Sequence, residues 1–311
     1  MSHLQRALEL AERGRGTTLP NPVVGAVVVA PNGTVVGEGW HERAGGPHAE
    51  VVALRAAGGR ARGATLYVTL EPCARFGRTP PCVDAIAGAG VAKVVVGTRD
   101  PSQLGADRLG ELGVEVEQLD LWDARRQNEA WLTWSKLERP FVTYKVAVTL
   151  DGRVTVPGSR WVSGEESRRL VHELRARSDA VAVGMGTVRA DGPRLDARGV
   201  EAPRQPRRLA FGSGPLPAGS ELELRSRAPE EELRSLAAEG VQSLLLEGGP
   251  TLGTAFLELD LVDKVLVFVA PALGGDGPHF VRDLERSVEL RRVTVRGVGP
   301  DLLVEAYIHE P

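Results

Sequence analysis

The feature that most constrains this chain is a histidine-alanine-glutamate triplet, His48 to Glu50, followed by two widely spaced cysteines. Cys73 follows a proline, and Cys82 lies nine positions further along the chain. One imidazole and two thiolates supply three zinc ligands, and a tetrahedral Zn²⁺ with three protein ligands keeps one open position, as catalytic sites do. We therefore predict one catalytic zinc ion per chain, held by His48, Cys73 and Cys82.

Glu50 is expected to carry protons and not to bind the metal. A zinc-bound water has its pKa lowered to about 7 and becomes a nucleophile. The pattern H-x-E followed by P-C-x-x-C is typical of zinc deaminases, in which the glutamate is the general acid and base. Here eight residues separate the cysteines, so the loop between them must fold back. The alternative is a structural zinc site, which would need a fourth ligand, and His41 is the candidate.

The length of 311 residues favours two domains, and Arg139-Pro140 is the predicted boundary. Apolar periodicity and turn residues give the elements of the first half. The predicted strands span residues 23–29, 34–40, 64–70, 93–97 and 114–119. The predicted helices span residues 4–14, 48–57, 82–89, 104–112 and 123–138. Such alternation predicts an α/β fold with a sheet covered on both faces, and it places His48 and Glu50 in the first turn of a helix.

The second half shows the same kind of alternation, although less regularly. Its predicted strands span residues 141–148, 180–184, 208–211, 243–246, 264–270 and 302–308. Its predicted helices span residues 165–177, 187–190, 229–239 and 251–259. Residues 194–206 are rich in Arg and Pro and are expected to form a loop, whereas residues 215–228 carry no clear pattern. We thus predict a second α/β domain.

Charge and composition exclude several classes of protein. A net charge of −3 argues against a general nucleic-acid binder. No apolar run reaches the 18 or so residues of a membrane span, and the amino-terminal residues do not resemble a signal peptide. In a chain without an export signal, two cysteines are more consistent with a metal site than with a disulfide. We expect a cytoplasmic protein that acts at neither a membrane nor a nucleic acid.

Four segments closely resemble the deaminase of the bifunctional deaminase-reductase family of riboflavin biosynthesis. They are TLPNPVVG at 18–25, GGPHAE at 45–50, VTLEPC at 68–73 and GRTPPC at 77–82. That family has the same eight-residue gap between its cysteines. The resemblance implies a cytidine-deaminase-like three-layer α/β/α domain in residues 1–140. It would convert 2,5-diamino-6-(5-phosphoribosylamino)pyrimidin-4(3H)-one to 5-amino-6-(5-phosphoribosylamino)uracil.

The same resemblance implies roles for further residues around the zinc site. Asn21 would hold the pyrimidine ring, and His41 and Arg78 would hold the ribose phosphate. The family usually has Cys-Ser-His where this chain has cysteine, alanine and Arg75, so an arginine replaces a histidine that helps bind the phosphoribosyl arm. Because a guanidinium can hold a phosphate through two parallel hydrogen bonds, we expect substrate binding to survive this replacement.

Motifs in the second half are similar to the reductase of the same family. They include Ser159-Arg160-Trp161, a glycine-rich turn from Glu247 to Gly253, and His172 three residues before Arg175. The turn follows an apolar strand and opens a helix, an arrangement that can bind phosphate. The resemblance implies a dihydrofolate-reductase-like α/β domain in residues 141–311. It would use NADPH to reduce the ribosyl chain of the deaminated product to ribityl.

By carry-over from the family, two sets of residues would form this second site. NADPH would lie against Ala147, Trp161, Thr187, Asp191, Gly249, Pro250, Thr251, Leu252 and Gly253. The substrate would be held by Ser159, Arg175, Leu195, Arg198 and Glu247. The family forms homo-oligomers, and the same is expected of this chain.

Simpler interpretations of several residues stay open at this point. They are solvated loop charges for Arg75 and Arg78, a turn residue for Asn21, a helix-surface charge for Arg175, and packing for Trp161.

Three hypotheses about function follow from the sequence. The first is a bifunctional deaminase and NADPH-dependent reductase. The second is a deaminase whose reductase half is degenerate, because residues 194–230 look shortened relative to the family. The third is a zinc-containing nucleic-acid-binding or editing module. The weak net charge and the lack of a basic stripe with interleaved aromatic residues argue against the third hypothesis. Binding of NADPH without nucleic acid would distinguish the first from the third.

Overall fold

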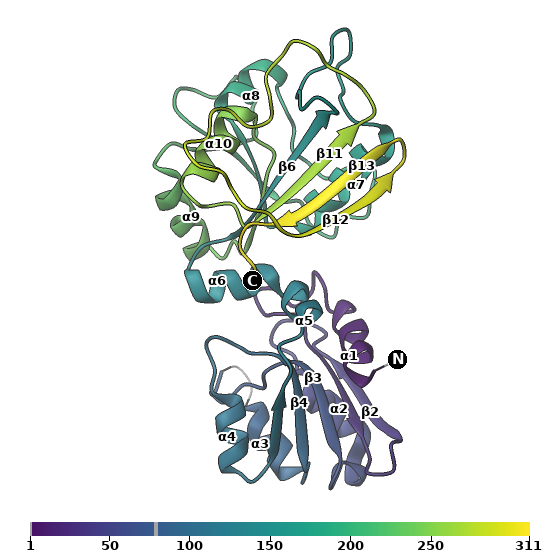
Figure 1. Ribbon diagram of the computed structural model, residues 1–311. Helices are drawn as coiled ribbons and strands as arrows, with labels where there is room; N and C mark the ends of the chain where they lie inside the picture. Colours follow the sequence, from purple (N-terminus) through teal and green to yellow (C-terminus); the bar gives the residue numbers. More distant parts are fainter. Residues whose placement is uncertain (1, 78–79) are drawn as a thin grey trace. The chain divides into compact units, whose positions relative to one another are not determined.

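The structure of the chain, a computed structural model, describes residues 2–77 and 80–311 (Figure 1). It divides into two compact units, a first that ends at Leu137 and a second that runs from Glu138 to Glu310. Each unit has its own sheet and its own hydrophobic core, so each is described by itself. Among the described residues, none of the helices combines the length and the apolar character needed to cross a lipid bilayer.

The first unit is built on a five-stranded sheet in the order β2-β1-β3-β4-β5. The strands are β1 (Gly25–Val29), β2 (Val35–Trp40), β3 (Thr65–Leu70), β4 (Lys93–Thr98) and β5 (Glu115–Gln118). Strand β1 pairs antiparallel with both β2 and β3, whereas β3, β4 and β5 run parallel. The carboxyl ends of β3 and β4 therefore lie at the same edge of the sheet.

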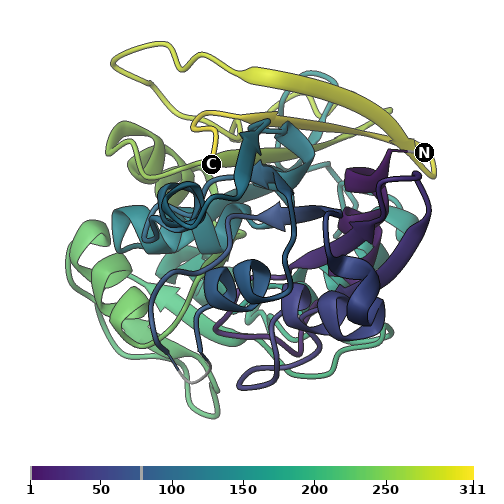
Figure 2. The same cartoon turned by 90° about the horizontal axis from the view of Figure 1, so that it is seen from below.

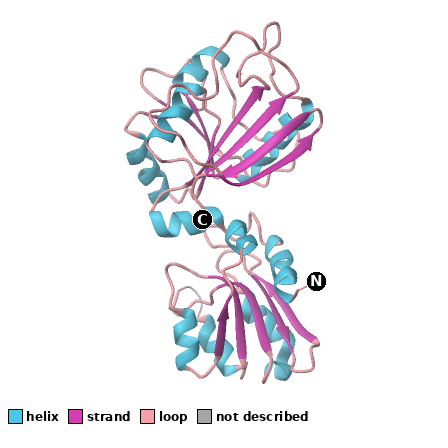
Figure 3. Ribbon diagram, viewed as in Figure 1, coloured by secondary structure: helices cyan, strands magenta, loops and turns pink. Residues whose placement is uncertain are grey.

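Helices cover both faces of this sheet (Figure 3). They are α1 (His3–Glu12), α2 (Ala49–Ala57), α3 (Cys82–Gly88), α4 (Gly105–Glu111) and α5 (Trp122–Gln127), and a sixth helix, α6 (Glu129–Leu137), follows α5. Successive residues of a strand face opposite sides of a sheet. Accordingly Ala26 and Val28 of β1 pack in one cluster with α2, α3 and α4, while Val27 and Val29 pack against α1. The result is a three-layer α/β/α unit.

The single helix predicted over residues 123–138 is wrong, because the chain breaks at Asn128 into α5 and α6. Asn128 is buried, and its side chain makes two hydrogen bonds with the backbone of Val23. Its Oδ1 accepts from the Val23 N–H at 3.0 Å, and its Nδ2 donates to the Val23 carbonyl at 2.8 Å. The break therefore fastens the segment that precedes β1 and carries Asn21.

Two glycines of β2 allow α2 to approach the sheet closely. A Cβ atom at Gly37 would lie 2.2 Å from the carbonyl oxygen of Ala53, and one at Gly39 would lie 2.6 Å from that of Ala49. Both distances are too short for a real contact. Since α2 begins directly after His48, this contact fixes how far the helix that carries Glu50 stands from the sheet.

Replacing Gly39 with alanine should lower the free energy of unfolding of the first unit by about 1–3 kcal/mol, the usual penalty for overpacking. Denaturant unfolding, followed by hydrogen exchange of amides in β1 and α2, would measure the loss. Gly59→Ala is the matched control, because a Cβ atom there meets nothing within 4 Å. Equal stability of the two variants would contradict the importance of the close approach.

The second unit contains an eight-stranded sheet in the order β12-β13-β11-β6-β10-β7-β8-β9. The strands are β6 (Phe141–Thr149), β7 (Ala180–Gly184), β8 (Arg207–Phe211), β9 (Glu223–Arg225), β10 (Ser243–Leu246), β11 (Lys264–Ala270), β12 (Arg291–Val298) and β13 (Asp301–Tyr307). Strands β6 to β11 run parallel, and β13 is antiparallel to its neighbours β11 and β12. Figure 2 shows the β12–β13 hairpin in yellow at one edge of the sheet.

Two pairs of helices cover the two faces of the second sheet. They are α7 (Glu165–Arg177) with α8 (Met185–Asp191), and α9 (Pro229–Ala238) with α10 (Pro250–Glu258). Leu233 of α9 and Phe256 of α10 pack in one core cluster, whereas Val171 of α7 and Val188 of α8 pack in clusters on the other face.

Two strands of this sheet were not predicted. Strand β9 lies in the region without a clear pattern, and β12 had been assigned to no element. All residues of β12 except Val298 are exposed, so this edge strand lacks the alternation of buried and exposed side chains that marks a strand in a sequence. The remaining predicted elements are present, with ends shifted by a few residues at most.

Candidate active sites

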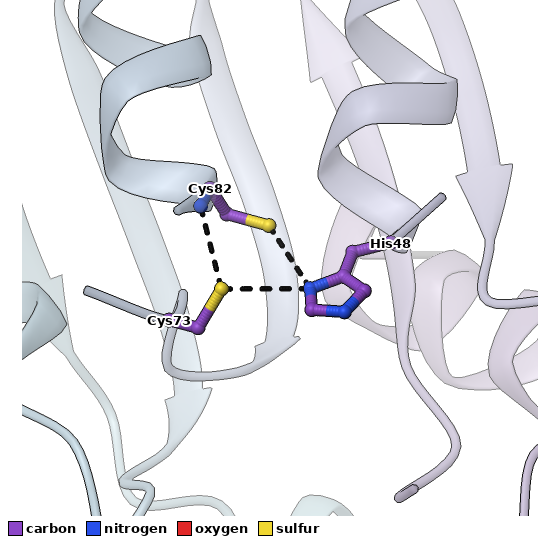
Figure 4. A group of neighbouring side chains, drawn as sticks. All are labelled: His48, Cys73 and Cys82. Atoms are coloured by element: carbon purple, nitrogen blue, oxygen red, sulfur yellow. Dashed lines mark hydrogen bonds between the residues drawn. The ribbon is translucent and has the colours of Figure 1, made fainter. Parts of the chain in front are cut away.

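His48, Cys73 and Cys82 meet at one point in the first unit (Figure 4). The Sγ atom of Cys82 lies 3.2 Å from Nδ1 of His48, and the Sγ atom of Cys73 lies 3.5 Å from the same nitrogen. The three possible ligand atoms all lie within 4.8 Å of one another. An imidazole with two sulfur atoms is a donor set that suits Zn²⁺, so the residues present fit the predicted metal.

Three different elements bring these ligands together. Cys73 follows β3, and Cys82 opens α3, so the loop between the cysteines does fold back. His48 was predicted in the first turn of a helix, but it is the residue just before α2, with extended backbone angles. This position turns its ring toward the two sulfur atoms, while Glu50 follows inside the first turn of α2.

Hydrogen bonds favour a thiolate at this point. The Cys82 backbone N–H donates to Sγ of Cys73 at 3.3 Å, and the side chains of Cys82 and His48 also contact that sulfur. These contacts lower the pKa of Cys73 to about 4. The neighbouring sulfur and burial raise the pKa of Cys82. A divalent cation held between the two would favour the ionised form of both.

Glu50 lies beside this cluster without belonging to it. The residue is 3% exposed, and its Oε2 has no hydrogen-bond partner among the described residues. Burial raises the pKa of Glu50, so its carboxyl group can hold a proton. A buried carboxyl group with a free oxygen next to a metal site is suited to shuttle protons.

The loop that carries Cys73 is held by Glu71 and Gln103, which lie outside the predicted site. The buried carboxylate of Glu71 accepts hydrogen bonds from the backbone N–H groups of Asp100 at 3.2 Å and Ala106 at 2.9 Å. The side chain of Gln103 accepts one from the N–H of Ala74 at 3.2 Å. The only signal in the sequence was a charged residue at the end of a buried strand.

Asn21 and His41, both predicted to bind substrate, are joined to each other. His41 is 3% exposed, its Nδ1 lies 3.0 Å from the Pro47 carbonyl, and its Nε2 lies 3.1 Å from Nδ2 of Asn21. Burial lowers the pKa of His41. Because its ring nitrogens face these two groups, His41 does not join the His48 cluster, and the geometry does not support a structural zinc site with four ligands.

Arg75 and Arg78, the two arginines predicted to hold the phosphoribosyl group, belong to the loop between Cys73 and Cys82. Arg75 is exposed on the loop after Cys73 and forms no ion pair within residues 2–77 and 80–311. Arg78 lies outside the described residues.

The second unit has a cavity of about 680 Å³ beside the carboxyl ends of β6, β7 and β10. Ligands of open α/β sheets bind at this end of the strands. Most of the predicted site residues line the cavity. They are Ala147, Trp161, Arg175, Thr187, Asp191, Arg198, Glu247, Gly249, Pro250, Thr251 and Leu252.

Three predicted residues are not among those that line the cavity. The Ser159 hydroxyl accepts from the N–H of Trp161 and donates to its carbonyl, and so shapes the loop. Leu195 is 2% exposed and belongs to a core cluster. Gly253 lies under Tyr144, whose hydroxyl would be 2.4 Å from a Cβ atom at that position.

Glu247 occupies the floor of the cavity between two cations. Arg175 donates to both of its carboxylate oxygens, from Nε at 2.6 Å and from Nη2 at 2.9 Å, and Nζ of Lys145 lies at 3.5 Å. Burial raises the pKa of Glu247, but the charge of Lys145 and the contacts of Arg175 more than offset it, and the pKa is lowered. Lys145 lines the cavity and had been given no role.

Two further arginines line the cavity and pack on Trp161. The guanidinium carbons of Arg160 and Arg168 lie 5.1 Å and 5.3 Å from the centre of its ring. Neither forms an ion pair within the described part of the chain, and Arg168 donates to the Ser163 carbonyl. The guanidinium of Arg198, by contrast, is paired with Asp196 at 2.5 Å.

Comparison with known proteins gives two family models that match the chain. Residues 1–98 match the zinc-binding region of the cytidine and deoxycytidylate deaminases. Residues 140–304 match the RibD C-terminal domain. The two matches follow one another along the chain, and each contains one of the two sites described above.

Whole proteins also match over nearly their full length. The chain is 40% identical to the riboflavin biosynthesis protein RibD of Aquifex aeolicus, with 97% of each chain covered. It is 41% identical to the protein of the same name from Mycobacterium tuberculosis, with 96% of this chain and 94% of that protein covered.

Solved structures agree with the sequence matches. The RibD structure from Acinetobacter baumannii has a TM-score of 0.87 and 35% identity, with 98% of this chain and 97% of that one covered. A diaminohydroxyphosphoribosylaminopyrimidine deaminase/5-amino-6-(5-phosphoribosylamino)uracil reductase from Thermotoga maritima has a TM-score of 0.84 at 35% identity, with 98% and 97% covered.

Proposed function

The chain belongs to the RibD family of riboflavin biosynthesis proteins, and from this premise we propose how its residues divide two reactions between two sites. It is a bifunctional enzyme, with a zinc-binding deaminase domain followed by an NADPH-dependent reductase domain. Both expected domain folds, cytidine-deaminase-like and dihydrofolate-reductase-like, are confirmed. The observation that carries the deaminase is the convergence of His48, Cys73 and Cys82 beside the buried Glu50.

We assign the deaminase to residues 1–140 and the reductase to residues 141–311. The ranges of the two family matches support this assignment, and so does the division of the structure between Leu137 and Glu138.

Deamination replaces a ring amino group by the oxygen of water and releases ammonia. His48, Cys73 and Cys82 would hold the zinc ion, which would supply the Lewis acid that activates the water. Glu50 takes a proton from the attacking water on its free Oε2 and passes it to the departing nitrogen, so that the C–N bond breaks to give ammonia. A carboxyl group with a raised pKa suits both halves of this task.

In the reductase we propose that NADPH would lie along the glycine-rich turn and the first residues of α10, where Gly249 to Leu252 line the cavity. NADPH supplies the hydride that reduces the ribosyl chain. Glu247 stays ionised between Arg175 and Lys145, and so it can accept hydrogen bonds from N–H groups of the uracil. Arg175 thus holds Glu247 in place, a function different from a direct grip on phosphate.

We further propose that Arg160 and Arg168 hold the substrate's phosphate. They line the cavity, and no carboxylate within the described residues neutralises them. The guanidinium groups of Arg175 and Arg198 are already paired with Glu247 and Asp196. A phosphate with two negative charges should bind more strongly to Arg160 and Arg168, whose charges are not neutralised, than to the two arginines that are already paired with carboxylates.

Arg168→Ala should raise the KM of the reductase for 5-amino-6-(5-phosphoribosylamino)uracil about 10- to 100-fold, because a charge-assisted hydrogen bond contributes about 1.5–3 kcal/mol. The Kd of NADPH, measured by fluorescence titration, should stay unchanged. Arg169→Ala is the matched control, since this neighbour is exposed and its ion pair among the described residues is with Glu173. A parallel rise in the Kd of NADPH would instead assign Arg168 to the cofactor.

The whole proposal is tested by supplying the purified protein with the phosphoribosyl diaminopyrimidinone and following ammonia release and NADPH oxidation separately. Equal amounts of ammonia released and NADPH oxidised are expected. Ammonia release without NADPH oxidation would select the alternative, a deaminase with a degenerate reductase half.

We also propose that the enzyme works in the cytoplasm as a homo-oligomer, on small molecules and not on nucleic acid. The net charge of −3 gives little attraction for a polyanion. Two free cysteines that must remain reduced to bind metal suit a reducing compartment. The oligomeric state can be measured by light scattering.

A further inference from the structure

We propose that His41 is a positioning residue of the deaminase, which orients the amide of Asn21 toward the pyrimidine ring and does not hold the ribose phosphate. The proposal rests on the deaminase function given above and assigns His41 a different role within that site. It is carried by the contacts of three groups, His41, Asn21 and the Pro47 carbonyl.

The contacts of His41 define which of its ring nitrogens carries the proton. The Pro47 carbonyl oxygen can only accept a hydrogen bond, so Nδ1, at 3.0 Å from it, must be the donor. A neutral imidazole has one donor and one acceptor nitrogen. Nε2 is therefore the acceptor, and it faces the side-chain nitrogen of Asn21 at 3.1 Å. Both nitrogens of this buried ring are engaged, which leaves no N–H to donate to a phosphate.

The same contact fixes the orientation of the Asn21 amide. Because Nε2 of His41 accepts, the NH₂ group of Asn21 must point toward it, and Oδ1 points the other way. The backbone around Asn21 is also fixed, since its N–H donates to the Thr18 carbonyl at 2.8 Å and Val23 is held by Asn128. Asn21 thus presents an oxygen acceptor to a substrate whose pyrimidine ring and amino groups carry N–H donors.

His41 links this acceptor to the metal site. The Pro47 carbonyl that it holds belongs to the residue just before His48, and the rings of His41 and His48 lie 5.3 Å apart in an edge-to-face contact. The backbone N–H of His41 donates to the Val24 carbonyl at 2.9 Å. One buried imidazole therefore sets the ring-binding residue and a zinc ligand relative to each other.

The test uses two substitutions, each of which keeps one of the two hydrogen bonds that the His41 ring makes. His41→Gln can reach Asn21 with a side-chain oxygen and accept its N–H. His41→Asn is shorter and can reach only the Pro47 carbonyl. Ammonia release is measured for the wild type and for both His41 variants. It is also measured for Asn21→Ala and for the double variant Asn21→Ala/His41→Asn. Two substrates are compared, the phosphoribosyl diaminopyrimidinone and its dephosphorylated ribosyl form.

His41→Asn is expected to lower kcat/KM about 10- to 100-fold, by the same factor for both substrates, and His41→Gln to recover most of that loss. The double variant should lose no more than Asn21→Ala alone, because His41 acts through Asn21. The Kd of the dephosphorylated deaminated product, measured by calorimetry, should rise in His41→Asn. Zinc should remain near one per chain in every variant.

Three results would overturn the proposal. A loss confined to the phosphorylated substrate would make His41 a phosphate ligand. Losses that multiply in the double variant would show that His41 does not act through Asn21. Loss of zinc from both His41 variants would make His41 a support of the metal site only. Failure of the proposed deaminase function can be distinguished from failure of the His41 proposal, because the wild type would then release no ammonia from either substrate.

Discussion

Replacing Glu50 with glutamine is expected to reduce ammonia release by about 100- to 10,000-fold, the usual contribution of a general acid and base. Glutamine has nearly the shape of glutamate but can neither take a proton from water nor return one to the leaving nitrogen. Glu50 is not among the three side chains proposed to bind the metal, so zinc should stay near one per chain. Ammonia release and the zinc content of the same sample are the measurements.

Asp84→Asn is the matched control for Glu50→Gln. Asp84 is an exposed carboxylate in the first turn of α3, two residues after the proposed ligand Cys82, and it should tolerate loss of its charge. The reductase, assayed with the deaminated substrate, should be unaffected in both variants. Normal deamination by Glu50→Gln would show that the proton passes through another group.

Cys73→Ala is expected to lower the zinc content from about one per chain to near zero and to abolish deamination. The substitution removes the thiol most easily ionised, since hydrogen bonds from Cys82 and His48 stabilise its thiolate. Two remaining protein ligands do not hold Zn²⁺ firmly, because even catalytic sites use three. Metal analysis after dialysis measures the loss, and NADPH oxidation with the deaminated substrate should continue.

A chelator supplies the control for Cys73→Ala. Wild-type protein stripped of metal should lose deamination to the same extent, and added Zn²⁺ should restore the wild type but not the variant. Full retention of zinc by Cys73→Ala would refute the assignment of this ligand.

The sequence predicted the parts of the structure that depend on residue type and local spacing. The convergence of His48, Cys73 and Cys82 could be predicted, because one imidazole and two thiolates are a donor set that suits Zn²⁺. Strands β10 and β11 have unbroken apolar runs, and their predicted bounds agree with the structure. Such features are decided by neighbours within a few positions along the chain.

Features that depend on distant residues could not be predicted. The break at Asn128 exists because its side chain binds the backbone of Val23, 105 residues earlier in the chain. Arg175, which is expected to hold substrate, pairs with Glu247, 72 residues away in the chain. The contact of His41 with Asn21, 20 residues earlier in the chain, likewise depends on the fold. In each case, the sequence identified a residue that matters and could not specify what it touches.

The separation of the two hydrophobic cores has a consequence for the supply of both activities in the cell. Each described site draws its side chains from one unit, yet both units are translated as one polypeptide. Every molecule synthesised therefore adds one deaminase and one reductase, whatever the level of expression. The ratio of the two catalytic capacities is then set by their turnover numbers alone and cannot drift through unequal gene dosage or unequal degradation of separate subunits.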